Sequence, residues 1–128
     1  MPKRSVSLVL IAVVLPLAAC QHPCVDYIVY GGHSADVLYH VKALRHELSS
    51  LPAKRRRVDQ EVFLILTSLR SMADDAAEAA PTTAGRLSDV ANALQNLHPS
   101  PKPIFRAALK DVSDAVNAGM PSGGCPMT

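Results

Sequence analysis

Apolar residues recur along most of the chain at alternating spacings of three and four positions. Four segments carry this pattern, at about 34–50, 54–80, 82–97 and 103–118. Such a spacing lines one face of an α-helix with apolar side chains, because a helix completes one turn in about 3.6 residues. The sequence therefore predicts an all-α protein with four amphipathic helices.

The first two predicted helices have the clearest apolar faces. The first is expected to begin at Ser34, a residue type that caps helix N-termini. Three further apolar residues widen the face of the second, which we expect to be the most buried helix. The two faces comprise Val37, Val41, Leu44, Leu48 and Leu51, and then Val58, Val62, Ile65, Leu69, Met72 and Ala76, widened by Phe63, Leu64 and Leu66.

Proline and glycine mark the ends of the other two helices. Pro81 ends the second helix, and Thr82 or Thr83 is expected to cap the third. Segment 98–103 contains three prolines and predicts a stiff loop. Gly119 is expected to end the fourth helix. The two apolar faces consist of Leu87, Val90, Leu94 and Leu97, and of Phe105, Leu109, Val112 and Val116.

Short connections between four helices predict a small antiparallel four-helix bundle over residues 34–119, with 120–128 as a C-terminal tail. Segment 25–33 is less regular. It is compatible with a short strand, with an extra helical turn, or with a first helix bent at Gly31 and Gly32. We expect a short apolar helical turn with a glycine hinge.

The first 20 residues have a different character. Lys3 and Arg4 precede an apolar stretch of about ten residues, which is typical of a secretory signal and shorter than the roughly 20 residues of a membrane span. The sequence Leu17-Ala18-Ala19-Cys20 resembles the lipobox of bacterial lipoprotein precursors. The resemblance implies that residues 1–19 are removed and that Cys20 receives lipid. The alternative is an ordinary signal cut after Ala19, with Cys20 as a free thiol.

Lipidation implies a location. Two or three acyl chains, such as palmitate, anchor a protein stably, whereas one chain holds it only marginally. Residues 20–33 would then form a lipidated tether and a short apolar segment in front of the bundle. The expected site is the bacterial cell membrane. Gln21, where an Asp would imply inner-membrane retention, favours the periplasmic face of the outer membrane in a Gram-negative host.

Two further cysteines, Cys24 and Cys125, lie near the two ends of the mature chain. In an oxidising compartment an even number of cysteines favours a disulfide, and an even number of helices brings these two ends together. The alternatives are two unpaired thiols and a soft-metal site for copper(I). No zinc-binding spacing occurs, so we predict no metal centre. The soft-metal site would comprise His22, Cys24, Met120, Cys125 and Met127; the five histidines, which lack zinc-binding spacing, are His22, His33, His40, His46 and His98.

Charge excludes one class of function. The chain has 13 Lys and Arg and 11 Asp and Glu. Loss of residues 1–19 removes Lys3 and Arg4 and no acid, so the mature chain has no net charge. A protein of this kind is not expected to bind nucleic acid, because that binding rewards a basic surface.

One basic run stands out, and three interpretations of it remain open. The first is a solvated run beside the carbonyl end of the first helix. The second is a patch for an anionic partner such as lipid headgroups, and the third is a contact in an antiparallel dimer. On the first interpretation, acids at the other end of the second helix lie beside the amide end of the third. The run is Lys54, Arg55, Arg56 and Arg57, and the acids are Asp74, Asp75 and Glu78.

No arrangement of residues indicates catalysis, since no serine occupies a glycine-flanked turn and no glycine-rich phosphate loop occurs. Tyr27, Tyr30 and Tyr39 suggest a docking patch or, more simply, core packing. We therefore expect a membrane-anchored cell-envelope lipoprotein that is not an enzyme and needs no cofactor. It would act as an accessory or inhibitor-type protein on an envelope protein partner. The alternative is an envelope lipoprotein that binds a small ligand or a soft metal.

Overall fold

The computed structural model describes residues 24–121, and within them the chain forms four α-helices. The all-α prediction is confirmed. The helices are α2 (Tyr27–Ser49), α3 (Arg55–Ala76), α4 (Pro81–Leu97) and α5 (Lys102–Asn117).

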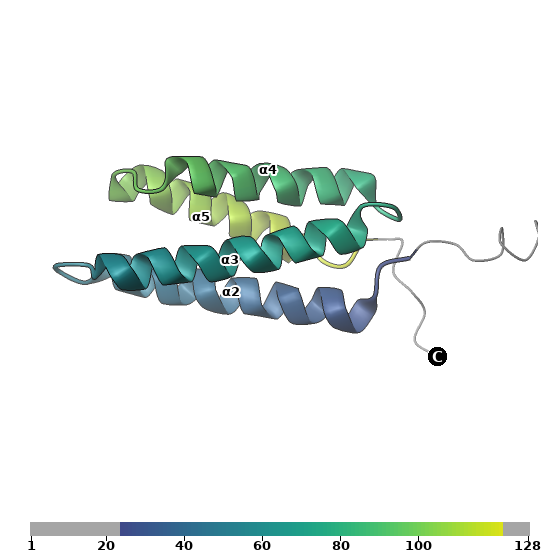
Figure 1. Cartoon of the computed structure of the whole chain (residues 1–128), viewed down its shortest axis with the longest axis horizontal. Coiled ribbons are helices and arrows are strands. Elements are labelled where there is room, and N and C mark those ends of the chain that lie inside the picture. Colours follow the sequence, from purple (N-terminus) through teal and green to yellow (C-terminus); the bar gives the residue numbers. More distant parts are fainter. Residues whose placement is uncertain (1–23, 122–128) are drawn as a thin grey trace, which may run out of the picture.

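The helices form an antiparallel bundle (Figure 1). Each helix packs against the next one along the chain, and α5 returns to pack against α2. The α2–α3 and α4–α5 loops lie at one end of the bundle, here called the loop end. The start of α2, the α3–α4 loop and the end of α5 lie at the opposite end, here called the terminal end. The predicted small four-helix bundle is thus the observed architecture.

The core consists of the four apolar faces, which meet along the axis of the bundle. Leu44, Ile65, Leu69, Leu87 and Leu109 are fully buried. The predicted faces are confirmed at most positions, and small residues at other positions of the same faces extend the core. The buried side chains that were predicted include Val37, Val41, Leu48, Val58, Val62, Met72, Ala76, Leu94, Phe105, Val112 and Val116.

The first helix begins at Tyr27, so the predicted start at Ser34 is wrong. The side chain of Asp26 caps the helix and accepts hydrogen bonds from the backbone N–H groups of Ile28 and Val29, both at 2.9 Å. Val25 and Tyr30 are both buried in the core, in the positions of a hydrophobic staple around the cap. A start at Asp26 therefore gives the helix both a side-chain cap and buried apolar residues on either side of that cap. A start at Ser34 would leave Tyr30 outside the helix.

The predicted glycine hinge is also wrong, because α2 continues through Gly31 and Gly32. Ser34 lies inside the helix and its hydroxyl donates a hydrogen bond to the carbonyl oxygen of Tyr30 at 3.0 Å. Burial of Tyr30 on the face that continues to Val37 holds these turns against the bundle. Tertiary packing thus offsets the low helix propensity of the two glycines.

Two large apolar residues lie outside the core, contrary to prediction. Leu51 is 90% exposed, because α2 ends at Ser49 and leaves Leu51 in the loop. Phe63 is 67% exposed on α3, whereas its neighbour Val62 is buried. The apolar face of α3 is therefore narrower than the sequence predicts.

The other helix ends agree with prediction only in part. Helix α3 ends at Ala76, before the expected end at Pro81, and neither predicted threonine caps α4. Pro81 is the first residue of α4, and the N-cap Ala80 makes no side-chain hydrogen bond. Helix α5 begins at Lys102, within the segment predicted as loop. Gly119 follows α5 with a φ of 89°, a left-handed conformation that favours glycine.

We predict that Leu69→Ala lowers the free energy of unfolding by about 2–5 kcal/mol, because it leaves a cavity at a fully buried position. Urea denaturation followed by circular dichroism measures this. Phe63→Ala on the exposed side of the same helix is the control and should change stability by less than about 0.5 kcal/mol. Equal losses for the two variants would contradict the described packing.

Candidate functional site

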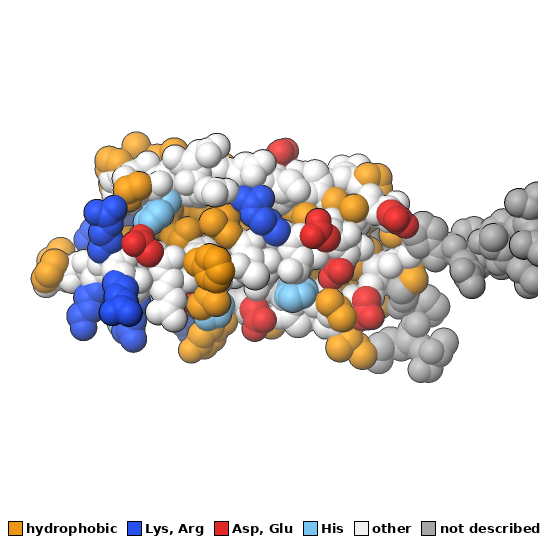
Figure 2. Space-filling view, in the orientation of Figure 1, with side chains coloured by type: hydrophobic (Ala, Val, Ile, Leu, Met, Phe, Trp, Pro, Cys, Tyr) orange, Lys and Arg blue, Asp and Glu red, His pale blue; other side chains and the backbone are white. Residues whose placement is uncertain are grey.

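Acidic and basic side chains lie toward opposite ends of the bundle, although the described residues carry no net charge (Figure 2). Basic side chains gather at the loop end, and most of the acidic side chains lie toward the terminal end. We define the basic pole as the four residues of the basic run together with two cations in the first two turns of α5. They are Lys54, Arg55, Arg56, Arg57, Lys102 and Arg106.

One buried acid holds the start of α3 in place. Glu47, in the last turn of α2, is only 6% exposed. Its Oε1 accepts a hydrogen bond from the backbone N–H of Lys54 at 2.8 Å, and its Oε2 lies 4.0 Å from Nη1 of Arg57. The N-cap residue Lys54 makes no capping bond of its own. Glu47 thus serves as the cap of the following helix and offsets part of the charge of the run.

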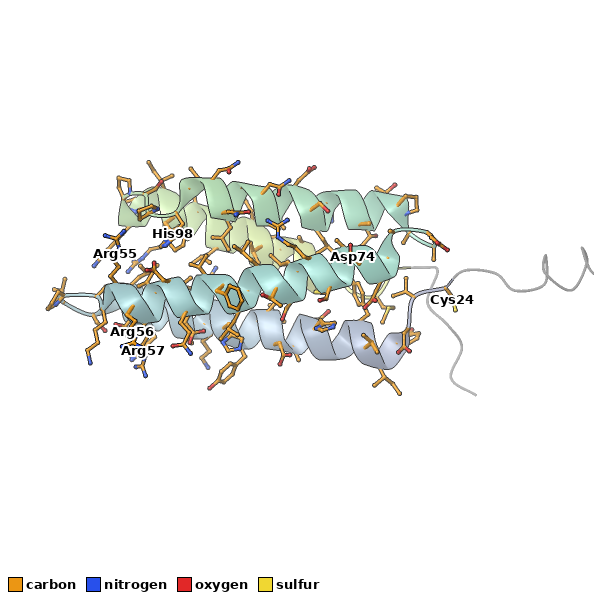
Figure 3. The ribbon with its side chains drawn as sticks, viewed as in Figure 1. Cys24, Arg55, Arg56, Arg57, Asp74 and His98 are labelled. Atoms are coloured by element: carbon orange, nitrogen blue, oxygen red, sulfur yellow. The ribbon has the colours of Figure 1, made fainter. Side chains whose placement is uncertain are left out.

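The basic run lies beside the last turn of α2, as one interpretation of the sequence expected, but only Arg57 pairs with an acid there. In the part of the chain that the structure describes, Lys54, Arg55, Arg56 and Lys102 form no ion pair. Figure 3 shows Arg55, Arg56 and Arg57 at the loop end with their side chains directed away from the core. These cations are therefore available to a partner.

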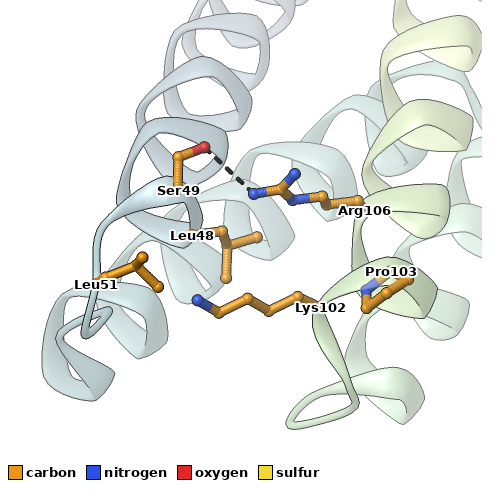
Figure 4. Close-up of a pocket in the computed structure, with 6 residues that line it drawn as sticks. All are labelled: Leu48, Ser49, Leu51, Lys102, Pro103 and Arg106. Carbon is orange, nitrogen blue, oxygen red and sulfur yellow. Dashed lines mark hydrogen bonds between the residues drawn. The ribbon is translucent and has the colours of Figure 1, made fainter.

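A shallow groove joins the end of α2 to the start of α5 (Figure 4). Arg106 crosses it and donates a hydrogen bond from Nη2 to the Ser49 hydroxyl oxygen at 3.2 Å. Lys102 lies one helical turn earlier on α5, near Leu51. Lys102 and Arg106 were not predicted to belong to this site, because they lie far from the basic run in sequence. The sequence does place Lys102 and Arg106 four residues apart, on one face at the start of the fourth predicted helix. In an antiparallel bundle, the start of that helix lies at the same end as the start of the second helix, which carries the basic run.

The acidic residues at the terminal end make fewer interactions than the sequence suggested. Asp74 and Asp75 lie in the last turn of α3, and Glu78 follows in the loop. None of the three has a described hydrogen bond to the first turn of α4. One carboxylate oxygen of Asp75 is buried without a hydrogen-bond partner among residues 24–121. The acids therefore add negative charge to this end without capping α4.

Two histidines make interhelical contacts with carboxylates. Nδ1 of His40 lies 2.6 Å from Oε2 of Glu61, which joins α2 to α3. Nε2 of His98 lies 2.6 Å from Oδ1 of Asp59, which joins the end of α4 to α3. Both are pairs of one imidazole and one carboxylate. No group of three metal-ligating side chains occurs within residues 24–121.

The three tyrosines do not form one patch. Tyr30 is buried, its hydroxyl has no hydrogen-bond partner among the described residues, and burial raises its pKa above the usual value. Tyr27 and Tyr39 are exposed, and the ring of Tyr39 meets that of His40 edge to face. The expectation of core packing applies to Tyr30 alone.

Of the predicted covalent sites, only Cys24 lies within the described residues; it is at the terminal end (Figure 3). Cys20 and Cys125 lie outside them, as do His22 and Met127 of the soft-metal alternative. Helix α5 ends at the same end of the bundle, and Met120 packs against the core there. Lipidation and the Cys24–Cys125 disulfide therefore stay predictions.

None of the four described helices is both long enough and apolar enough to span a bilayer. A scan of protein-family models and searches of curated proteins and solved structures found no match to this chain. The site itself offers a cationic surface with a shallow groove at one end of a packed bundle.

We predict that Glu47→Ala lowers the free energy of unfolding by about 1–3 kcal/mol, because it removes a buried acceptor from the start of α3. Glu47→Gln should cost less, since the amide oxygen can still accept the bond from Lys54. Chemical denaturation measures both variants. Glu78→Ala, an exposed acid in a loop, is the control and should stay within about 0.5 kcal/mol of the parent chain.

Proposed function

We propose that this protein is a membrane-anchored lipoprotein of the bacterial cell envelope that acts by binding a partner and not by catalysis. The observation that carries the proposal is the lipobox, with Cys20 only seven positions ahead of the first helical residue, Tyr27. Acylation of Cys20 would hold the bundle by its terminal end. In a Gram-negative host we place it on the periplasmic face of the outer membrane.

The packed apolar interior of the bundle favours binding of a partner at the outer surface over binding of a ligand inside. The core is one apolar cluster, and the only buried polar residues of the described part are Glu47 and Ser113. Apart from the Tyr30 hydroxyl and one Asp75 oxygen, a small polar ligand inside the bundle would find few hydrogen-bond partners to replace its hydration. An accessory or inhibitor-type interaction through the outer surface therefore has more support than a ligand in the interior.

We predict that Cys20→Ala releases the protein from the membrane, because it removes the sulfur that would carry the lipid. The measurement is fractionation of the native host followed by immunoblotting, with intact-mass spectrometry of the parent protein. Ser34→Ala, inside the bundle, is the control and should leave the protein in the membrane fraction. A parent chain without added lipid mass would refute the proposal.

The disulfide is a second part of the proposal, supported by the common end at which α2 begins and α5 ends. We predict that Cys24→Ser and Cys125→Ser each lower the free energy of unfolding by about 2–4 kcal/mol, because the bridge closes a long loop. The double variant should lose no more than either single variant. Additive losses, or no loss, would show that the two sulfurs are not joined.

A further inference from the structure

The tip of the loop end combines an exposed apolar side chain with surrounding cations. Leu51 lies in the α2–α3 loop, which forms the far end of the molecule in Figure 1. Figure 4 shows it beside Lys102. Ile104, in the first turn of α5, is half exposed at the same end. Two exposed apolar side chains thus lie at the same end of the bundle as the basic pole.

The negative charge near this pole is already engaged. Glu47 is buried and accepts the Lys54 backbone bond. Asp59, one turn into α3, contacts His98. The side chains of Lys54, Arg55 and Lys102 have no acidic partner among residues 24–121. The surplus positive charge can therefore be matched only from outside the molecule.

We propose that the basic pole docks on an anionic lipid surface, with lipid phosphates around its cations and Leu51 entering the headgroup region. Each Lys or Arg close to such a surface strengthens binding about fivefold. At the tip, Leu51 is 90% exposed, and the groove beside it is shallow. A fluid leaflet can adapt to a protruding apolar side chain, whereas a protein partner would need a preformed pocket ringed by acids.

The length of the bundle indicates which membrane the pole can reach. Helix α3 has 22 residues and is about 33 Å long. The seven residue steps from Cys20 to Tyr27 extend to at most about 25 Å. With Leu51 inserted along the bundle axis, the anchor could not return to the same leaflet. The pole therefore contacts a second, facing surface; this geometry rests on the proposed acylation of Cys20, whereas the lipid binding does not.

The acids at the terminal end fit the same orientation. Asp26, Asp74, Asp75 and Glu78 lie where the tether leaves the bundle. An anionic leaflet around the anchor repels these carboxylates. The repulsion acts over about 8–10 Å at physiological salt, a fraction of the bundle length. The anchoring membrane thus favours a bundle that points its basic pole away.

The first test uses the chain from Gln21 to Thr128, which contains all four helices and the core but no acylation site. It is sedimented with vesicles of phosphatidylcholine plus phosphatidylglycerol, and with vesicles of phosphatidylcholine alone. We expect binding to the anionic vesicles only, and weaker binding as salt rises. Absence of binding, or equal binding to both, overturns the inference and would leave an acidic protein as the occupant of the pole.

Matched variants locate the contact. The double variant Arg55→Glu, Arg56→Glu should weaken vesicle binding about 25-fold or more. It should remain folded, because acidic side chains at the start of a helix are stabilising. Arg86→Glu with Lys110→Glu changes the net charge equally, on exposed residues away from the pole, and should retain most of the binding. Leu51→Ser should weaken binding about tenfold. Equal losses for the two double variants would show a dependence on net charge alone and would overturn the assignment to the pole.

The second test addresses the facing geometry. The acylated protein is inserted into phosphatidylcholine vesicles, and vesicles containing phosphatidylglycerol are added. We expect the two populations to associate, measured by light scattering, and expect no association with the Arg55→Glu, Arg56→Glu variant. Lipid binding in the first test without association here would overturn the bridging geometry. Failure of the first test leaves acylation untouched, because the Cys20→Ala fractionation decides that separately.

Discussion

The burial of four apolar helix faces against one another is the interaction on which this structure depends. Each helix packs only on its two neighbours around the bundle, and α5 closes it by returning to α2. Closure fixes which helix ends come together. It places the α2–α3 loop beside the α4–α5 loop, and the start of α2 beside the end of α5. The charged surfaces and the expected position of the anchor follow from that arrangement.

The distribution of charge is a consequence of this closure. A run of cations at a helix start is unfavourable by itself, because it opposes the partial positive charge of that helix end. Packing of α2 against α3 supplies Glu47 to the start of α3, and packing of α5 against α2 adds Lys102 and Arg106 nearby. Residues 24–121 thus carry no net charge, but the two ends of the bundle have opposite character.

The sequence predicted the core better than it predicted the edges of the helices. Positions such as Ile65, Leu69 and Leu109 followed directly from the helical period, and all are fully buried. Ser34 had the chemistry of a cap but lies inside α2, because Asp26, eight residues earlier, caps the helix and Tyr30, which lies between them, is buried. Phe63 is apolar but faces solvent, since burial of Val62 and Ile65 fixes the rotation of α3.

The sequence by itself determined the fold class, the number of helices and most of the core, because these follow from spacing along one chain. It also contains the run from Lys54 to Arg57 and the segment Leu17–Cys20 that resembles a lipobox, both of which are contiguous motifs. Only the tertiary structure decided that Glu47 caps α3, that Lys102 and Arg106 join the run, and that Leu51 projects from its tip. These relations join residues on different helices, and the packing of the bundle, which no local pattern encodes, brings them together.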